Sequence, residues 1–128
     1  MRFDKSTSGL DFESQKQVKQ QIKPEQPGIY CKACHNHVTD PSHAVEINGA
    51  FRFVFSNPDG ISFEIGMYDQ ADCPAISPPV YEHTWFAGFA WQIVVCDYCK
   101  QHLGWSYSRT DSPDFYGLIL DRLVQVDK

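Results

Sequence analysis

The sequence predicts a mainly β domain pinned by a four-cysteine zinc site. Apolar and polar residues alternate over several short segments, a pattern typical of strands with one buried face. Two widely separated Cys-x-x-Cys pairs supply the four thiolates that a structural zinc ion prefers. At 128 residues the chain has the size of one domain, for which a metal would supplement a modest core.

Residues 1–27 are interpreted as an N-terminal extension, and residues 28–126 as the zinc-binding β domain. The extension is rich in Gln, Lys and Ser and ends in KPEQPG. Ser8 and Asp11 could cap a helix over residues 11–22, but its apolar stripe is thin. We expect a disordered tail or a short, frayed helix here, with a docked or partner-binding helix as the alternative.

Two strands joined by a tight turn are predicted after the first cysteine pair. Apolar residues occupy every second position in residues 51–56 and again in residues 61–67. The sequence NPDG lies between them, where Pro58 presets φ for a turn and Gly60 supplies the positive φ that closes it. We therefore predict a hairpin centred on Pro58 and Asp59.

A proline-containing loop and further strands follow. Residues 72–83, DCPAISPPVYEH, cannot form a central strand because proline donates no backbone hydrogen bond. One face of the next strand carries Phe89, Trp91, Ile93 and Val95, and one face of the strand after it carries Leu103, Trp105 and Tyr107. A hairpin folded about residue 98 would place Trp91 roughly opposite Trp105. A final strand is predicted in FYGLILDRL.

The two Cys-x-x-Cys pairs, CKAC and CDYC, predict a closed metal site. Each pair forms a tight turn that presents two sulfur atoms, and two such turns complete a tetrahedral shell. We predict one structural Zn²⁺ with the ligands Cys31, Cys34, Cys96 and Cys99. Because four protein ligands leave no open position, the metal is expected to stabilise the fold and not to catalyse a reaction.

Other interpretations of these cysteines remain open. CKACH has the form of a c-type haem attachment sequence, because His35 directly follows the second cysteine, but haem attachment would require export. Alternatively, His35, His37 or His102 replaces one cysteine ligand. The fifth cysteine, Cys73, is expected to be a buried or partly buried thiol.

Composition excludes several classes of partner. The net charge of −5 disfavours a surface that follows nucleic-acid phosphates. The N-terminus lacks the apolar segment of a signal peptide, and the longest apolar run, residues 85–96, is too short to span a bilayer. We therefore expect a cytoplasmic protein with no nucleic-acid or membrane partner. In that reducing compartment, paired cysteines hold metal more often than they form disulfides.

The tryptophans complete a resemblance to a known family. HTWFAGFAWQIVVCDYCKQHLGW, with CKAC and NPDG upstream and SPDFYGLI downstream, resembles the thalidomide-binding (CULT) domain of cereblon. The similarity covers about residues 29–123 and implies a β-tent fold, in which two antiparallel sheets meet at an angle and are pinned by zinc. It implies either a single-domain relative of the bacterial type or an isolated domain. No ubiquitin ligase adaptor is expected, because 128 residues leave no room for the cereblon regions that would dock one.

The resemblance also implies a ligand pocket. Trp85, Trp91 and Trp105 would be its walls, Tyr107 its floor, His83 and the Trp85 backbone its polar contacts, and Asn57 and Pro58 its cover. The implied ligands are cyclic imides: the glutarimide of thalidomide-type drugs, imide-terminated peptides from damaged proteins, and uracil-like rings. No catalytic residue is implied, so a binding module and not an enzyme is expected.

Two other functions stay open at this point, since indole faces suit either a cation or a flat uncharged ring. A methionine sulfoxide reductase on the same β-tent scaffold would need a nucleophilic cysteine in the aromatic pocket, yet no cysteine follows Cys99. An aromatic-cage reader of methylated lysine would need a carboxylate against the cation, and Glu82, beside His83, is expected to point away.

Overall fold

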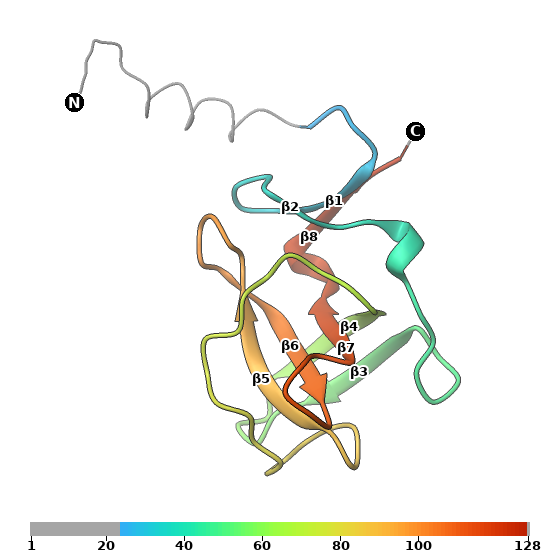
Figure 1. The fold of residues 1–128 in the computed structure, drawn as a ribbon. Coiled ribbons are helices and arrows are strands. Elements are labelled where there is room, and N and C mark those ends of the chain that lie inside the picture. The colour runs from blue at the N-terminus through green and yellow to red at the C-terminus, as the bar shows by residue number, and fades with distance from the viewer. Residues whose placement is uncertain (1–23, 128) are drawn as a thin grey trace, which may run out of the picture.

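A computed structural model describes residues 24–127 of the chain, which form two antiparallel β-sheets (Figure 1). The three-stranded sheet has the order β2-β1-β8 and contains β1 (Gly28–Cys31), β2 (His37–Thr39) and β8 (Leu123–Val126). The five-stranded sheet has the order β3-β4-β7-β6-β5 and contains β3 (Arg52–Ser56), β4 (Ser62–Tyr68), β5 (Ala90–Val95), β6 (His102–Ser108) and β7 (Phe115–Ile119). The predicted mainly β class with two antiparallel sheets is confirmed.

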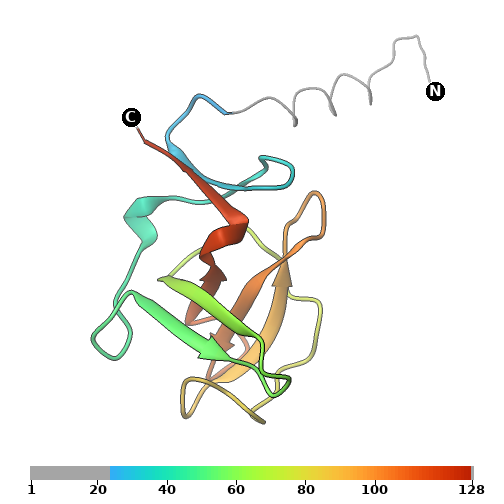
Figure 2. The ribbon, with the colours of Figure 1, turned by 180° about the vertical axis from the view of Figure 1, so that it is seen from behind.

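Two short 3₁₀ turns connect these elements, η1 (Pro41–His43) and η2 (Leu120–Arg122). The helix predicted around residues 11–22 lies outside the described residues. No helix within residues 24–127 is long and apolar enough to cross a membrane. Figures 1 and 2 show from opposite sides that the three-stranded sheet lies above the five-stranded sheet.

The hairpin of β3 and β4 forms as predicted. Its register pairs Ser56 with Ser62, which centres the turn on Asp59. The side chain of Asn57 accepts a hydrogen bond of 2.9 Å from the backbone N–H of Ile61, and Gly60 has a φ of 82°. The NPDG sequence therefore closes a tight connection at the end of the large sheet.

The register of β5 and β6 differs from the prediction. Trp91 lies opposite Tyr107, and Trp105 lies opposite Ile93. The expectation that Trp91 roughly faces Trp105 is therefore wrong by two residues along β6. Both indoles still lie on the same face of the sheet, as diagonal neighbours.

The cause of this difference lies at the end of the hairpin that carries the second cysteine pair. The turn between Val95 and His102 takes one residue more than a turn about residue 98, and a bulge beside Val94 adds another. The bulge also separates Leu103 from the tryptophan on its strand. Leu103 packs in the cluster between the sheets, contrary to the prediction from simple alternation.

The predicted final strand is two strands. β7 pairs with β4 and β6 in the large sheet, whereas β8 pairs with β1 in the small sheet. The turn η2 bends the chain between them, and the N–H of Lys32 donates a 3.0 Å hydrogen bond to the carbonyl of Arg122. FYGLILDRL therefore joins the two sheets covalently.

The proline-containing loop covers the outer edge of β5. The N–H of Ile76 donates to the carbonyl of Ile93 at 2.9 Å, and Val80 and Trp91 exchange two hydrogen bonds of 2.8 and 3.0 Å. The loop thus protects a sheet edge while remaining too irregular to be a strand, as its prolines predict. Its far end delivers residues 82–85 to the tryptophan face.

The core has two parts. The cluster between the sheets contains Ile29, Cys31, Val38, Tyr68, Cys73, Val94, Cys96, Leu103 and Leu118. The second cluster, on the tryptophan face of the large sheet, contains Ile65, Met67, Phe86, Tyr107, Phe115 and Ile119. Cys31 and Cys96 thus belong to the first cluster and Cys34 packs against it, whereas the three tryptophans pack against the second.

Strands β6 and β7 leave no room for a side chain at Gly104. A Cβ atom added there would collide with the carbonyl oxygen of Gly117 and lie 2.9 Å from the Cα of Leu118. We expect Gly104→Ala to lower the free energy of unfolding by about 3 kcal/mol or more, because backbone atoms cannot easily move aside.

Gly49→Ala is the matched control for this substitution. Gly49 has a φ of 90°, but an added Cβ would meet nothing within 4 Å. Its expected loss is therefore only about 1 kcal/mol, which reflects backbone strain alone. Chemical denaturation measures both values, and equal losses would contradict the close approach at Gly104.

Candidate functional site

The two cysteine pairs form turns of the same design. The N–H of His35 donates to the carbonyl of Cys31 at 2.7 Å, and the N–H of Lys100 donates to that of Cys96 at 3.0 Å. His35 and Lys100, which each follow the second cysteine of a pair, have φ values of 64° and 68°. Each turn therefore curls its backbone around two sulfur atoms.

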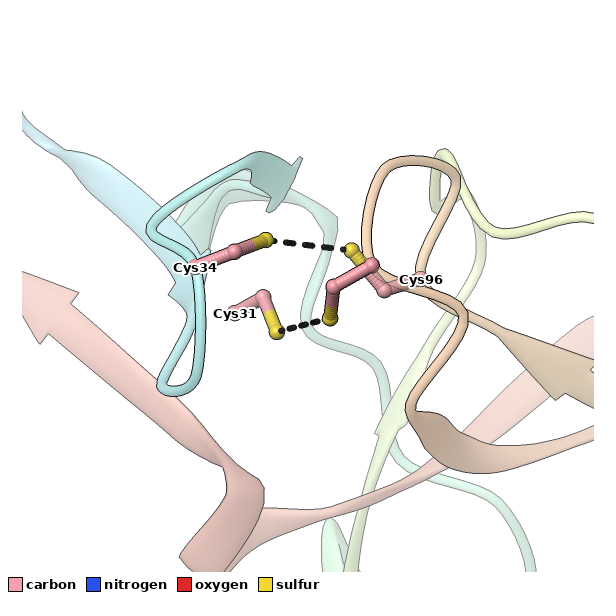
Figure 3. A group of neighbouring side chains, drawn as sticks. Cys31, Cys34 and Cys96 are labelled. Carbon is pink, nitrogen blue, oxygen red and sulfur yellow. Dashed lines mark hydrogen bonds between the residues drawn. The ribbon is translucent and has the colours of Figure 1, made fainter. Parts of the chain in front are cut away.

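The two turns bring all four predicted ligands together. The sulfur atoms of Cys31, Cys34, Cys96 and Cys99 lie within 4.8 Å of one another. The sulfur atoms make two short contacts between the turns, 3.7 Å from Cys31 to Cys99 and 3.6 Å from Cys34 to Cys96. Figure 3 shows Cys31 and Cys34 facing the turn that carries Cys96. A tetrahedral ion with Zn–S bonds of about 2.3 Å would place its sulfurs about 3.8 Å apart. The four cysteines thus lie close enough, and in a suitable arrangement, to bind one metal ion.

The pKa values of these cysteines show what a metal ion would have to supply. Burial raises the pKa of Cys31 to about 11 and also raises the pKa of Cys34. Burial acts in the same direction on Cys96, but hydrogen bonds from the backbone of Cys99 and Tyr98 and from the side chains of Cys34 and Cys99 together outweigh it and lower the Cys96 pKa. Because metals bind thiolates, the positive charge of an ion must provide the remaining stabilisation.

The structure separates the alternative ligands from this cluster. Among residues 24–127, the metal-binding group of side chains contains four cysteines and no histidine. The ring of His37 contacts Asp40 at 2.9 Å, and that of His102 contacts the carbonyl of Gly104 at 3.0 Å. Cys73 is buried, and this burial raises its pKa to about 12. It is therefore an unreactive thiol in the core, as expected.

A second feature, a cavity of about 440 Å³, opens on the tryptophan face of the large sheet. Its lining residues are Asn57, Pro58, Phe63, His83, Trp85, Trp91, Ile93, His102, Trp105 and Tyr107. All seven residues predicted for a ligand pocket lie around it. Phe63, Ile93 and His102 were not predicted, although alternation along their strands already placed Phe63 and Ile93 on apolar faces.

Trp85 is held against the β3–β4 hairpin. Its indole stacks on Phe55 with ring centres 4.9 Å apart, and its Nε1–H donates to the carbonyl of Ser56 at 3.3 Å. Its edge meets Trp105 at 4.8 Å. The preceding residue, Thr84, closes the loop with a 2.8 Å hydrogen bond to the carbonyl of Phe89. One wall of the cavity is thus fixed by the hairpin and the loop together.

Trp91 and Tyr107, a second wall and the floor of the cavity, are also held in place. Trp91 Nε1–H donates to the carbonyl of Glu82 at 2.8 Å, which ties β5 to the loop. Tyr107 is only 1% exposed, stacks on Phe115 at 5.2 Å and meets the edge of Phe86 at 4.8 Å. Burial raises the pKa of Tyr107, so its hydroxyl is uncharged at neutral pH.

Polar groups in the lining are few. Asn57 uses its side-chain oxygen within the hairpin turn. His83 has a φ of 62°, and its exposed side chain lies 3.6 Å from the Glu82 carboxylate. His102 is half-buried, and this burial lowers its pKa. The cavity therefore offers mostly ring faces, with a small number of hydrogen-bonding groups at its edge.

The chain is similar to several proteins named cereblon. Cereblon of Danio rerio is 33% identical over 104 residues, which cover 75% of this chain. The chain carries a cereblon-like CULT domain. Cereblons of Gallus gallus and Xenopus tropicalis are 35% identical over 75 residues and 38% identical over 69 residues, or 55% and 50% of this chain.

The similarity concerns only part of those proteins. The chain spans 24% of the length of the Danio rerio cereblon, and 17% and 15% of the Gallus gallus and Xenopus tropicalis cereblons. No family model matches the chain. The comparisons therefore identify a cereblon-like domain and leave whole-protein activities aside.

The cysteine cluster yields a direct test. We expect one divalent metal ion per chain by elemental analysis, and we expect Cys96→Ser to lose that ion and to unfold at a much lower temperature. The reason is that closed metal sites can contribute on the order of 10 kcal/mol to folding. Cys73→Ser is the matched control, because Cys73 is buried beside the site without belonging to it. Metal loss from the control variant, with full retention in Cys96→Ser, would refute the ligand assignment.

Proposed function

We propose that this domain is a binding module that captures cyclic imides in its tryptophan cavity, without catalysing a reaction. One observation carries the proposal: Trp85, Trp91 and Trp105 line a single cavity. The N–H groups of Trp85 and Trp91 already bind backbone carbonyls. Their ring faces are therefore what a ligand would meet.

The lining favours a neutral ring over a cation. Aromatic cages for cations usually add a carboxylate, and the cavity-lining residues of the described chain include no Asp or Glu. The carboxylate of Glu82, beside the lining residue His83, lies 3.6 Å from the His83 ring, and its side chain is 79% exposed. This composition supports an uncharged ligand and weighs against a reader of methylated lysine.

A cyclic imide matches the remaining chemistry. Its methylenes would pack on the indoles, and its C(=O)–NH–C(=O) edge would meet His83 and the backbone of Trp85. An imide group left unpaired in an apolar pocket would cost about 1 to 3 kcal/mol, so these edge contacts would discriminate between ligands. Asn57 and Pro58 would close over the ring from the hairpin.

The candidate ligands are glutarimide, imide-terminated peptides and uracil-like rings. The cavity volume of about 440 Å³ lies within the range of roughly 300 to 1,000 Å³ typical of small-molecule sites. A ring of about eight heavy atoms, at roughly 0.3 to 1.5 kcal/mol per atom, would bind between millimolar and nanomolar affinity, with micromolar as the middle of that range.

The remaining parts of the proposal concern the metal ion, the domain bounds and the cellular compartment. We assign Zn²⁺ as the metal, because four thiolates in a tetrahedral arrangement are its usual closed site. Its role would be structural, within a domain at residues 28–126. Small ligands in the cytoplasm, and not nucleic acid or membranes, would be its partners.

A β-tent reductase remains the rival function. It would need a nucleophilic cysteine in the cavity, and none of the described lining residues is a cysteine. Cys73 lines a separate polar groove together with His37, Asp72 and Asp97. This separation favours a binding role, and methionine sulfoxide reduction that depends on Cys73 would favour the rival.

We expect Trp91→Ala and Trp105→Ala each to abolish glutarimide binding while retaining the metal. Each substitution removes a wall of the cavity without touching a cysteine ligand, and binding is followed by isothermal titration. Val54→Ala is the control, because Val54 is 67% exposed and does not line the cavity. Undiminished binding by both tryptophan variants, or binding of trimethyl-lysine in preference to glutarimide, would refute the proposed function.

His83 and the imide N–H provide a second prediction. We expect His83→Ala to weaken glutarimide binding about tenfold, the loss of one hydrogen bond worth about 1.4 kcal/mol. N-methylglutarimide, which keeps the ring but lacks the donor, should bind weakly to the native protein. If it binds as well as glutarimide, the polar edge of the ligand makes no contact in this cavity.

A further inference from the structure

His102 lies where the metal site and the cavity meet. It is the first residue of β6, three positions after the ligand Cys99, and it lines the cavity. Its ring meets Trp105 edge to face, with ring centres 4.9 Å apart and an interplanar angle of 89°. We use the term metal-side wall for His102, Trp105 and Phe63.

A hydrogen bond of the His102 side chain indicates which ring nitrogen carries the proton when the imidazole is uncharged. Its Nε2 lies 3.0 Å from the carbonyl oxygen of Gly104. A carbonyl oxygen only accepts hydrogen bonds, so Nε2 carries the proton and donates it. In the neutral ring, Nδ1 is then an acceptor without a proton.

A fixed positive charge lies behind the metal-side wall. Arg122, in η2, donates from Nη1 to the carbonyl of His102 at 2.8 Å, and its guanidinium lies 5.8 Å from the centre of the Phe63 ring. Burial lowers the pKa of His102, and the charge of Arg122 lowers it further, although the hydrogen bond to Gly104 acts in the opposite direction. The imidazole is therefore uncharged at neutral pH.

The other ionisable groups around the cavity do not compensate a proton on His102. Tyr107, on the same strand, is held neutral by burial. On the loop, Glu82 pairs with His83 at 3.6 Å, and Glu82 does not line the cavity. An additional positive charge on the metal-side wall would thus face Arg122 with no lining carboxylate among the described residues.

We propose that His102 is a specificity-determining residue of this cavity: its uncharged imidazole allows the metal-side wall to hold a neutral ring, and its protonation expels that ring. The inference rests on the proposed imide binding. A ligand that fills the cavity removes water from the His102 ring, and a charged imidazole loses more solvation than a neutral one. Ligand binding and protonation of His102 therefore oppose each other.

Isothermal titration with glutarimide between pH 7.5 and pH 5 tests this. We expect the dissociation constant of the native protein to rise about three- to tenfold at the acid end, since the protonated fraction increases up to tenfold per pH unit. His102→Gln retains an N–H donor for Gly104 but takes up no proton, so its affinity should be nearly independent of pH. His43→Gln, at a histidine that pairs with Asp69 at 3.0 Å and does not line the cavity, should retain the native pH dependence.

The outcomes separate this inference from the proposed function. Glutarimide binding that does not change with pH, or a pH dependence lost in His83→Gln and kept in His102→Gln, overturns the role of His102 alone. No glutarimide binding at any pH overturns the proposed function and this inference with it. If His102→Gln does not fold, NMR titration of the native histidine rings replaces it: the ligand must lower the His102 pKa, and an unchanged pKa overturns the inference.

Discussion

The rest of the structure depends on the clamp between two cysteine turns. Cys31 ends a strand of the small sheet and Cys96 follows a strand of the large one, so an ion bound by both pairs joins the sheets directly. The chain itself passes between the two sheets twice, from β2 to β3 through η1 and from β7 to β8 through η2. A domain of this size buries limited apolar surface, so such a clamp adds stability that the two core clusters alone would supply with difficulty.

The same clamp sets the geometry of the cavity. The second cysteine turn is also the connection of the β5–β6 hairpin, and the bulge beside Val94 follows it directly. Because side chains alternate along a strand, a slip of one residue there would send Trp105 to the opposite face of the sheet. A metal ion held by this turn would therefore act on the cavity through strand register, although none of the four cysteines lines the cavity. Ile93 and His102, three positions before Cys96 and three positions after Cys99, are the cavity-lining residues nearest to this turn in sequence.

Much of this could be predicted, and the failures have physical causes. Alternation, NPDG and the cysteine pairs are local signals, so the first hairpin and the metal cluster follow from them. The bulge beside Val94 has no comparable signature, and it moved both the pairing of the tryptophans and the packing of Leu103. Nor does FYGLILDRL contain a proline or an internal break that marks η2, which depends on contacts with the small sheet. His102 was considered only as a metal ligand, because spacing alone does not say which side of the turn its ring occupies.

The proposed small, neutral ligand would explain why so much aromatic packing supports this cavity. A ring of about eight heavy atoms offers few contacts, so little of its binding energy can be used to order a mobile site. Here the indole of Trp85 is stacked on Phe55 and bonded to Ser56, and that of Trp91 is bonded to the loop. These contacts form when the protein folds, so the entropy loss of ordering the indoles does not reduce the binding energy of a ligand. Under the proposed function, a cavity built in this way would bind a weakly interacting ring and would depend on a metal ion at the four cysteines to hold its frame.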